Sequence, residues 1–255
     1  MFRNRIIVNI DGLEHRRGKW GNPAKRFLRF SEKCTVLFAD IVVADNQAIK
    51  DYVWDTYSKD AVLIAYGGDH ALRDVSAEES GAVLEKYNLT ASSYAITVCR
   101  IEPENNCHII LEAFSRSNIK FIFIGNWNRS KYGKSLKEKY SCYENIKILD
   151  PIYDLDELFV LRSNAGLYVH GHSAGGTNPS LVEAMHMAIP IAAYDVEYNK
   201  ATTERYALYF KDCESLRNII ENRNSYVNVG MKMKEIAQKE YTWKDIINKY
   251  ETLIR

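Results

Sequence analysis

The chain has 255 residues, of which 46% are hydrophobic and 26% charged, and its 34 Lys and Arg against 33 Asp and Glu give a formal net charge of +1. This balance is typical of a globular protein with a sizeable core and argues against broad binding to nucleic acid, so we expect no nucleic-acid partner. Five scattered cysteines without a CxxC spacing favour free thiols over a disulfide framework or a zinc site. No apolar run has the length of a membrane span, and no signal peptide is recognisable, which predicts a cytoplasmic protein.

The part of the chain before residue 70 reads as half of a doubly wound domain. Short apolar runs predict strands at 5–10, 41–44 and 61–65, and helical periodicity predicts helices at 22–38 and 47–56. The first helix is amphipathic, and its apolar residues Phe27, Phe30, Cys34, Leu37 and Phe38 recur at helical spacing. Its other side carries Lys25, Arg26, Arg29 and Lys33, which fits either solvent or anionic lipid headgroups.

A charged loop, DGLEHRRGKW at 11–20, follows the first predicted strand. Such a cluster is either a solvated face or a functional loop, because open α/β sheets carry functional groups at the carboxyl ends of their strands. The glycine pair in YGGDH at 66–70 indicates a connection with positive φ or close backbone approach. Residues 74–89 are polar and irregular, with a short helix near 83–87, and we expect the boundary between two units there.

From residue 94 onward, strands and helices alternate regularly. We expect a parallel sheet with helices on both faces, since short links between alternating elements favour that arrangement. The predicted strands are 94–99, 121–124, 146–149, 167–170 and 189–194, and the predicted helices are 106–115, 130–140, 155–161, 180–187, 214–221, 228–239 and 243–254.

The stretch 166–194 has the layout strand, glycine-containing loop, helix, strand. A loop of this kind presents backbone N–H groups at a helix N-terminus, where the dipole favours an anion such as phosphate. Thr177, Asn178 and Ser180 add side-chain donors, and Glu183, one turn into the helix, is placed to accept hydrogen bonds from sugar hydroxyls. The alternative interpretation of the same pattern is an ordinary capped helix.

Arg100 ends the first strand of the second unit, where a guanidinium either reaches a diphosphate or pairs with Glu102 or Glu104. His170 and His172 are two residues apart on one strand face, but no third metal ligand is evident, so no metal is expected. No motif in the sequence identifies a reaction by itself.

Four segments resemble one known family. TVCRIEPENNCHIILEAF (97–114) resembles the opening of the C-terminal domain in GT-B glycosyltransferases, and GHSAGGTNPSLVEAMHMAIPIAAYD (171–195) is similar to the donor signature of the retaining glycosyltransferase family 4. YTWKDIINKYETLI (241–254) resembles the closing helix of that family. NIDGLEHRRGKW (9–20) resembles a rhamnosyltransferase-like subgroup found in bacterial cell-surface polysaccharide biosynthesis.

The resemblance implies a role for each matching residue. Glu183 corresponds to the glutamate that binds the nucleotide ribose. The other glutamate of the signature is replaced by glycine, at Gly176 in the pair Gly175–Gly176, so its contact to the transferred sugar is implied to come from the backbone of 175–178. Thr177, Asn178 and Ser180 lie in the same donor segment.

At the diphosphate, the resemblance implies a contact from Arg100. The lysine that usually accompanies it is replaced by the neutral Asn105. The resemblance therefore implies that Arg100 and the helix start at Ser180 offset more of the negative charge of the diphosphate. Asp11 stands where many relatives have a histidine near the acceptor. An aspartate there is implied to take a proton from the acceptor or to support positive charge developing on the sugar.

The implied fold is α/β of the GT-B type, with two Rossmann-like doubly wound parallel-sheet domains. We expect an incomplete N-terminal acceptor-side domain at 1–75, a donor-binding domain at 76–240 and a helix at 241–255 that packs back on the N-terminal domain. The implied activity is transfer of a sugar, with retention, from dTDP-rhamnose or a UDP-hexose to a saccharide or lipid-linked acceptor, without a cofactor or metal. The alternative is a catalytically inactive nucleotide-sugar-binding remnant or one subunit of a split glycosyltransferase. Expected partners are the donor, the acceptor, a polypeptide that supplies the missing N-terminal half, and the inner face of the cytoplasmic membrane as a peripheral contact.

Overall fold

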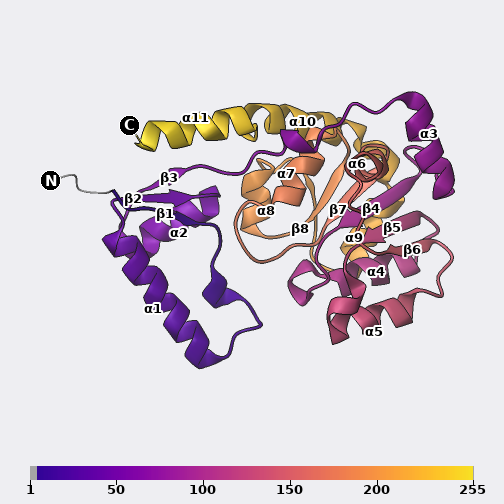
Figure 1. The fold of residues 1–255 in the computed structure, drawn as a ribbon. Coiled ribbons are helices and arrows are strands. Elements are labelled where there is room, and N and C mark those ends of the chain that lie inside the picture. Colours follow the sequence, from indigo (N-terminus) through magenta and orange to yellow (C-terminus); the bar gives the residue numbers. More distant parts are fainter. Residues whose placement is uncertain (1–4, 255) are drawn as a thin grey trace.

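A computed structural model describes residues 5–254, which form two separate parallel sheets with flanking helices (Figure 1). The smaller sheet has the order β1-β2-β3, with β1 at Ile7–Ile10, β2 at Ile41–Ala44 and β3 at Ala61–Leu63. Helix α1 (Asn22–Phe38) connects β1 to β2, and α2 (Gln47–Tyr57) connects β2 to β3. The predicted three strands and two helices of this N-terminal unit are therefore confirmed, and residues 1–4 and 255 of the predicted units lie outside the described residues.

Helix α1 is amphipathic as predicted, but its apolar side is exposed. Phe27, Phe30, Leu37 and Phe38 are 68%, 65%, 52% and 77% exposed, whereas Val36 is fully buried. The inward side of the helix also carries Glu32, whose carboxylate is the centre of a polar cluster. Its carboxylate accepts hydrogen bonds from the Tyr52 and Tyr57 hydroxyls at 2.7 Å each and lies 3.1 Å from His15 Nδ1.

The larger sheet has the order β6-β5-β4-β7-β8-β9, and all of its pairs are parallel. Because parallel sheets are covered on both faces, its strands are apolar along their length, and alternate residues belong to different cores. Tyr94, Ile96 and Tyr168 pack in one core with α7 (Pro179–His186) and α10 (Val227–Glu240). Ala95, Phe121 and Val169 pack in the other core with α4 (Cys107–Ser115) and α9 (Cys213–Glu221). The strands are β4 (Tyr94–Val98), β5 (Lys120–Ile124), β6 (Ile146–Leu149), β7 (Leu167–His170), β8 (Ile191–Tyr194) and β9 (Leu208–Phe210).

Apart from α8, the helices of this C-terminal unit follow the predicted positions closely. They are α4 (Cys107–Ser115), α5 (Lys131–Tyr140), α6 (Leu155–Ser163), α7 (Pro179–His186), α8 (Glu197–Thr202), α9 (Cys213–Glu221), α10 (Val227–Glu240) and α11 (Trp243–Ile254), and α3 (Ala77–Lys86) precedes β4.

Three elements differ from the sequence prediction. The short helix expected near 83–87 is the longer α3, whose start is a capping box between Ser76 and Glu79, a signal that the sequence contains. Helix α8 and strand β9 were not predicted. Both are short, and β9 is stabilised by pairing with β8, a long-range contact that local periodicity does not reveal.

The connection between the units depends on close backbone approach. A Cβ on Gly67 would lie 2.6 Å from the Trp243 ring, and one on Gly68 would lie 2.7 Å from the backbone of Val182. Trp243 also donates its backbone N–H to Asp69 Oδ1 at 2.8 Å, and from there α11 extends toward the N-terminal unit (Figure 1). The close approach predicted for the glycine pair is confirmed. Within residues 5–254, the structure contains no helix that combines the length and the apolar character needed to cross a membrane.

Candidate donor site

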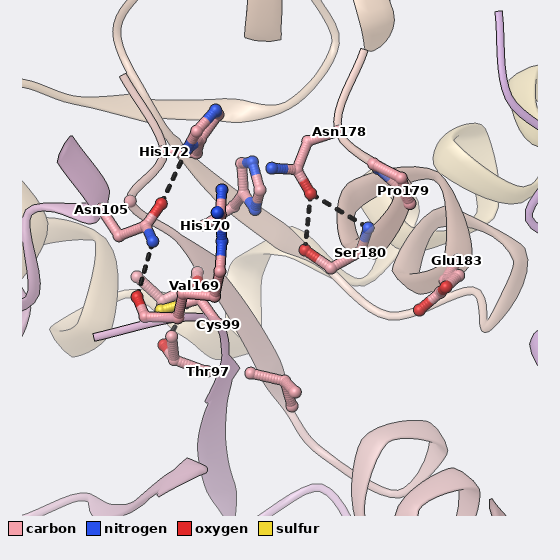
Figure 2. Close-up of a pocket in the computed structure, with 13 residues that line it drawn as sticks. Thr97, Cys99, Asn105, Val169, His170, His172, Asn178, Pro179, Ser180 and Glu183 are labelled. Carbon is pink, nitrogen blue, oxygen red and sulfur yellow. Dashed lines mark hydrogen bonds between the residues drawn. The ribbon is translucent and has the colours of Figure 1, made fainter. Parts of the chain in front are cut away.

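A cavity of about 360 Å³ opens at the carboxyl ends of β4 and β7 (Figure 2). These two strands are neighbours, but the chain leaves β4 toward β5 and β6 and leaves β7 toward β8 and β9. Such a switch point opens a crevice, because the connections on its two sides diverge, and ligands of open α/β sheets bind there. The lining comes from the end of β4 (Thr97, Val98, Cys99, Arg100), from Asn105, from the end of β7 (Val169, His170, Gly171, His172) and from the start of α7 (Asn178, Pro179, Ser180, Glu183).

Arg100 and Glu183 are the charged residues of this lining. The Arg100 side chain is 58% exposed, and its closest carboxylate oxygen belongs to Glu102 at 3.8 Å, so its guanidinium has donors available. Glu183 is more enclosed: its Oε2 accepts a hydrogen bond from Arg162 Nη1 at 2.7 Å, and its Oε1 lies 3.5 Å from His70 Nε2. Arg162 also donates to the Ser180 carbonyl at 3.0 Å. Arg162 therefore fixes both Glu183 and the first turn of α7.

Asn105, His170 and His172 form the polar floor of the cavity. Asn105 donates its Nδ2 to the Arg100 carbonyl at 2.6 Å, and its Oδ1 lies 2.7 Å from His172 Nδ1, so its amide holds the Arg100 loop in place. Burial lowers the pKa of His170 to about 3 and that of His172 to about 4, so both rings are neutral at physiological pH. The buried His170 Nε2 has no hydrogen-bond partner within residues 5–254, and in Figure 2 its ring and the Asn178 side chain project toward each other.

The start of α7 differs from the predicted anion site. Asn178 is the N-cap: its Oδ1 accepts from the Ser180 N–H at 3.0 Å and from the Ser180 hydroxyl at 2.8 Å, and its carbonyl accepts from Leu181 and Val182. Pro179 has no N–H to offer. The prediction of free N–H groups in this first turn is therefore wrong, because the cap satisfies the donors of the helix start internally.

Gly175, Gly176 and Thr177 lie outside the cavity lining. The Gly176 N–H donates to the Asp11 carbonyl at 3.4 Å, and a Cβ on Gly12 would lie 3.1 Å from Gly175 Cα. Thr177 is buried and bonded to Asp45. Of the residues that the sequence assigned to the donor, the structure thus brings Arg100, Asn105, Asn178, Ser180 and Glu183 together, and it places Asp11 against the loop behind them.

Sequence reasoning missed Arg162 and Asp45 and treated His170 only as a metal ligand. Asp45 directly follows a predicted strand, which was an available signal, whereas Arg162 lies inside α6 and meets Glu183 only through packing. Within residues 5–254, no three His, Cys, Asp or Glu residues gather as a set of metal ligands.

A second, more apolar cavity of about 330 Å³ adjoins the first. It shares Val98, Cys99 and Arg100 with the first cavity and extends to the ends of β5 and β6. Arg100 therefore stands at the junction of a polar and an apolar compartment. The other residues of its lining are Ile101, Glu102, Ile124, Gly125, Asn126, Arg129, Ser130, Pro151, Ile152 and Leu158.

The sequence profile of the family "Glycosyl transferases group 1" matches residues 84–235, more than half of the chain and all of the elements around both cavities. The chain belongs to this family. A second profile, "Domain of unknown function (DUF1972)", matches residues 2–69 of this group 1 glycosyl transferase. No curated protein matches its sequence.

Solved structures with the same fold are longer than this glycosyl transferase and share little sequence with it. Sucrose-phosphate synthase from Thermosynechococcus elongatus superposes with a TM-score of 0.82 at 18% identity, over 100% of this chain and 68% of that one. HepE from Anabaena in complex with UDP-glucose gives 0.81 at 16% identity, over 98% and 72% of the two chains. A glycosyltransferase from Rickettsia africae gives 0.74 at 15% identity, over 97% and 69%. The predicted α/β fold of the GT-B type is confirmed.

Proposed function

We propose that this chain binds a nucleotide diphosphate sugar across the two adjoining cavities and transfers the sugar to a saccharide or lipid-linked acceptor. The observation that carries this proposal is the position of Arg100 between a polar cavity at β4 and β7 and an apolar cavity at β5 and β6. A nucleotide sugar is divided in a similar way, into an apolar base at one end and a polar ribose, an anionic diphosphate and a polar sugar along the rest of its length. HepE, which has the same fold, is described in complex with UDP-glucose.

In this proposal three residues of the polar cavity contact the donor. The Arg100 guanidinium pairs with the diphosphate, for which its planar fork of donors is suited. Glu183 accepts from ribose hydroxyls through Oε1, since Arg162 already engages Oε2. The neutral His170 offers an otherwise unpaired Nε2 to the donor in the polar cavity. The apolar cavity takes the base, and we keep dTDP-rhamnose and UDP-hexoses as the candidate donors.

On the acceptor side, Asp11 is assigned to take the acceptor proton or to support the positive charge that develops on the sugar, with retention of configuration. No metal is assigned, because Arg100 and the helix dipole of α7 offset the charge of the leaving diphosphate. We further propose that the protein acts in polysaccharide biosynthesis, makes a peripheral contact with the cytoplasmic membrane, and binds a partner that completes the three-stranded sheet.

Two observations favour a second candidate function, nucleotide-sugar binding without catalysis by this chain alone. Both cavities are lined by the C-terminal unit, and Asp11 is absent from their linings. The β1 edge of the smaller sheet has no further strand within the described residues. Under this alternative the donor still binds, but turnover needs an additional acceptor-side element.

The donor assignment is tested by calorimetric titration of UDP-glucose and dTDP-rhamnose into the wild type and into Glu183→Ala and Glu183→Gln. Loss of a charge-assisted hydrogen bond to ribose should weaken binding about tenfold or more, with Gln intermediate because it keeps an oxygen acceptor. Glu112→Ala is the matched control, since Glu112 pairs with Arg116 on the surface of α4, away from both cavities. Equal affinity of wild type and Glu183→Ala would contradict the assignment of Glu183 to the donor ribose.

Catalysis is tested separately with the donor that binds most tightly. A transferase assay with oligosaccharide and lipid-linked acceptors should detect turnover that falls in Asp11→Asn while donor affinity stays unchanged. Binding without turnover by the wild type would favour the second candidate function, and full activity of Asp11→Asn would remove Asp11 from the mechanism.

A further inference from the structure

The carboxylate of Asp45 belongs to the N-terminal unit but holds the loop that leads into α7. Asp45 follows β2 and is completely buried. Its Oδ2 accepts the Thr177 N–H at 3.0 Å, and its backbone carbonyl accepts the Thr177 hydroxyl at 2.5 Å. The neighbouring Asn46 donates its Nδ2 to Thr177 Oγ1 at 3.3 Å and to Thr202 Oγ1 in α8 at 3.1 Å. The end of β2 is therefore tied to two segments of the C-terminal unit.

The same carboxylate leaves no space for a side chain on the loop. A Cβ on Gly176 would lie 1.9 Å from Asp45 Oδ1 and 2.4 Å from its Cγ, far inside contact distance. The Asp45 side chain is short and enclosed, so it cannot swing away as the end of a long surface side chain would. Asp45 and Gly176 are thus a complementary pair across the boundary between the units.

Asp45 is also an unfavourable group in the folded chain. Its Oδ1 is buried and has no hydrogen-bond partner within residues 5–254. Burial and the nearby charge of Asp11 raise its pKa to about 7. The other titratable groups that face it are Tyr66 and Tyr250, whose pKa values are raised by burial and then by Asp45, and Lys249 and Glu240 across a small cavity. A buried carboxylate that lowers stability in this way is a candidate for a functional role.

We infer that Asp45 is a positioning residue of the donor site, which fixes loop 175–178 and thereby the placement of Asn178 and Ser180 in the polar cavity. The chain is continuous from Thr177 to Asn178, whose side chain caps α7 and lines the cavity. Releasing Thr177 lets the cap move, so donor binding would have to order the loop again. This inference rests on the proposed donor site, and it adds a residue of the N-terminal unit to it.

Donor affinity provides the first test. Asp45→Ala should weaken UDP-glucose binding about tenfold, whereas Asp45→Asn, which keeps an oxygen acceptor for the Thr177 N–H, should weaken it by only about threefold. The midpoint of thermal unfolding should not fall in either variant, because each removes a costly buried charge. Asp51→Ala is the control, since Asp51 is an exposed carboxylate on α2 that accepts a hydrogen bond from Gln47 in its own helix. Affinity of Asp45→Ala within twofold of wild type would overturn the inference, as would loss of affinity that merely follows a drop in thermal stability.

A double-mutant cycle tests the pairing with Gly176. Gly176→Ala should weaken UDP-glucose binding strongly in the wild type but add little in the Asp45→Ala background, because the opposing carboxylate is gone. Additive effects of the two substitutions would contradict the pairing. If Gly176→Ala alone does not fold, recovery of folding in the double variant supports the pairing. If neither the single nor the double variant folds, the pairing is contradicted.

Hydrogen exchange separates this inference from the proposed function. Exchange in residues 172–182 should be faster in Asp45→Ala than in wild type without any ligand, and unchanged in Asp51→Ala. If wild type binds neither UDP-glucose nor dTDP-rhamnose, the proposed function fails while this measurement still decides whether Asp45 holds the loop. Unchanged exchange in Asp45→Ala would overturn the role of Asp45 even if the donor binds.

Discussion

The two sheets of this protein are built from the same alternation of strand and helix, but they bury very different amounts of apolar surface. The six-stranded sheet has a core on each face, with fully buried aromatic residues such as Tyr94, Phe121 and Tyr168. The three-stranded sheet has a smaller core of aliphatic residues, and it leaves Ile6 beside β1 53% exposed. The comparison indicates that stability and the donor cavities reside in the C-terminal unit.

The N-terminal unit contributes to the site mainly through its contacts with loop 175–178. Asp11 and Asp45, each just beyond a strand of the smaller sheet, accept hydrogen bonds from the backbone N–H groups of Gly176 and Thr177. Helix α11 adds a second connection through Trp243. The difference between the units therefore separates a region that builds the cavity from a region that holds its loop in place.

The largest expected effect contrasts the two cores directly. Phe121 is fully buried and stacks on Phe114 with ring centroids 3.9 Å apart. Phe121→Ala should lower the free energy of unfolding by about 4 kcal/mol, because a large side chain is lost from a close-packed core. Phe27→Ala on the exposed side of α1 should change it by less than about 0.5 kcal/mol. Urea denaturation measures both, and comparable losses would contradict the assignment of stability to the larger sheet.

A smaller loss is expected at the ion pair beneath the cavity. The Arg162 side chain is only 4% exposed, so Arg162→Ala leaves Glu183 without its main partner and should cost about 3 kcal/mol of unfolding free energy. Arg217→Ala serves as the control, because Arg217 pairs with Glu214 and Glu221 on the surface and should cost no more than about 0.5 kcal/mol. Equal losses in the two variants would show that the buried pair gives α7 no special support.

The smallest effect concerns pH and the boundary between the units. The pKa of Asp45 is about 7 in the folded chain, above its ordinary value of 3.8, so the folded state binds a proton that the unfolded state has released. Stability should therefore fall as pH rises toward the folded pKa, by about 1 kcal/mol between pH 6 and 7, and level off above it. Asp45→Asn should lack this contribution. Denaturation at several pH values measures it, and identical pH profiles for wild type and variant would show that Asp45 does not titrate in this range.

Much of the fold was predictable from local pattern. Apolar runs predicted five of the six strands of the larger sheet, because strands buried on both faces are continuously hydrophobic. Strand β9, at Leu208–Phe210, escaped because three residues carry little periodic signal. The apolar spacing along α1 was also read correctly, but periodicity alone does not say whether an apolar side meets the core or solvent.

The sequence by itself determined the α/β class, the carboxyl-end position of Arg100 and the helix start that carries Ser180 and Glu183, because each depends on neighbours along the chain. Only the tertiary structure decided that Asn178 satisfies the donors of that helix and that Arg162 holds Glu183. It also decided that Asp45 occupies the space beside Gly176. These contacts join residues from different elements, and their hydrogen bonds and close approaches exist only once the two sheets and α6 are packed around the loop.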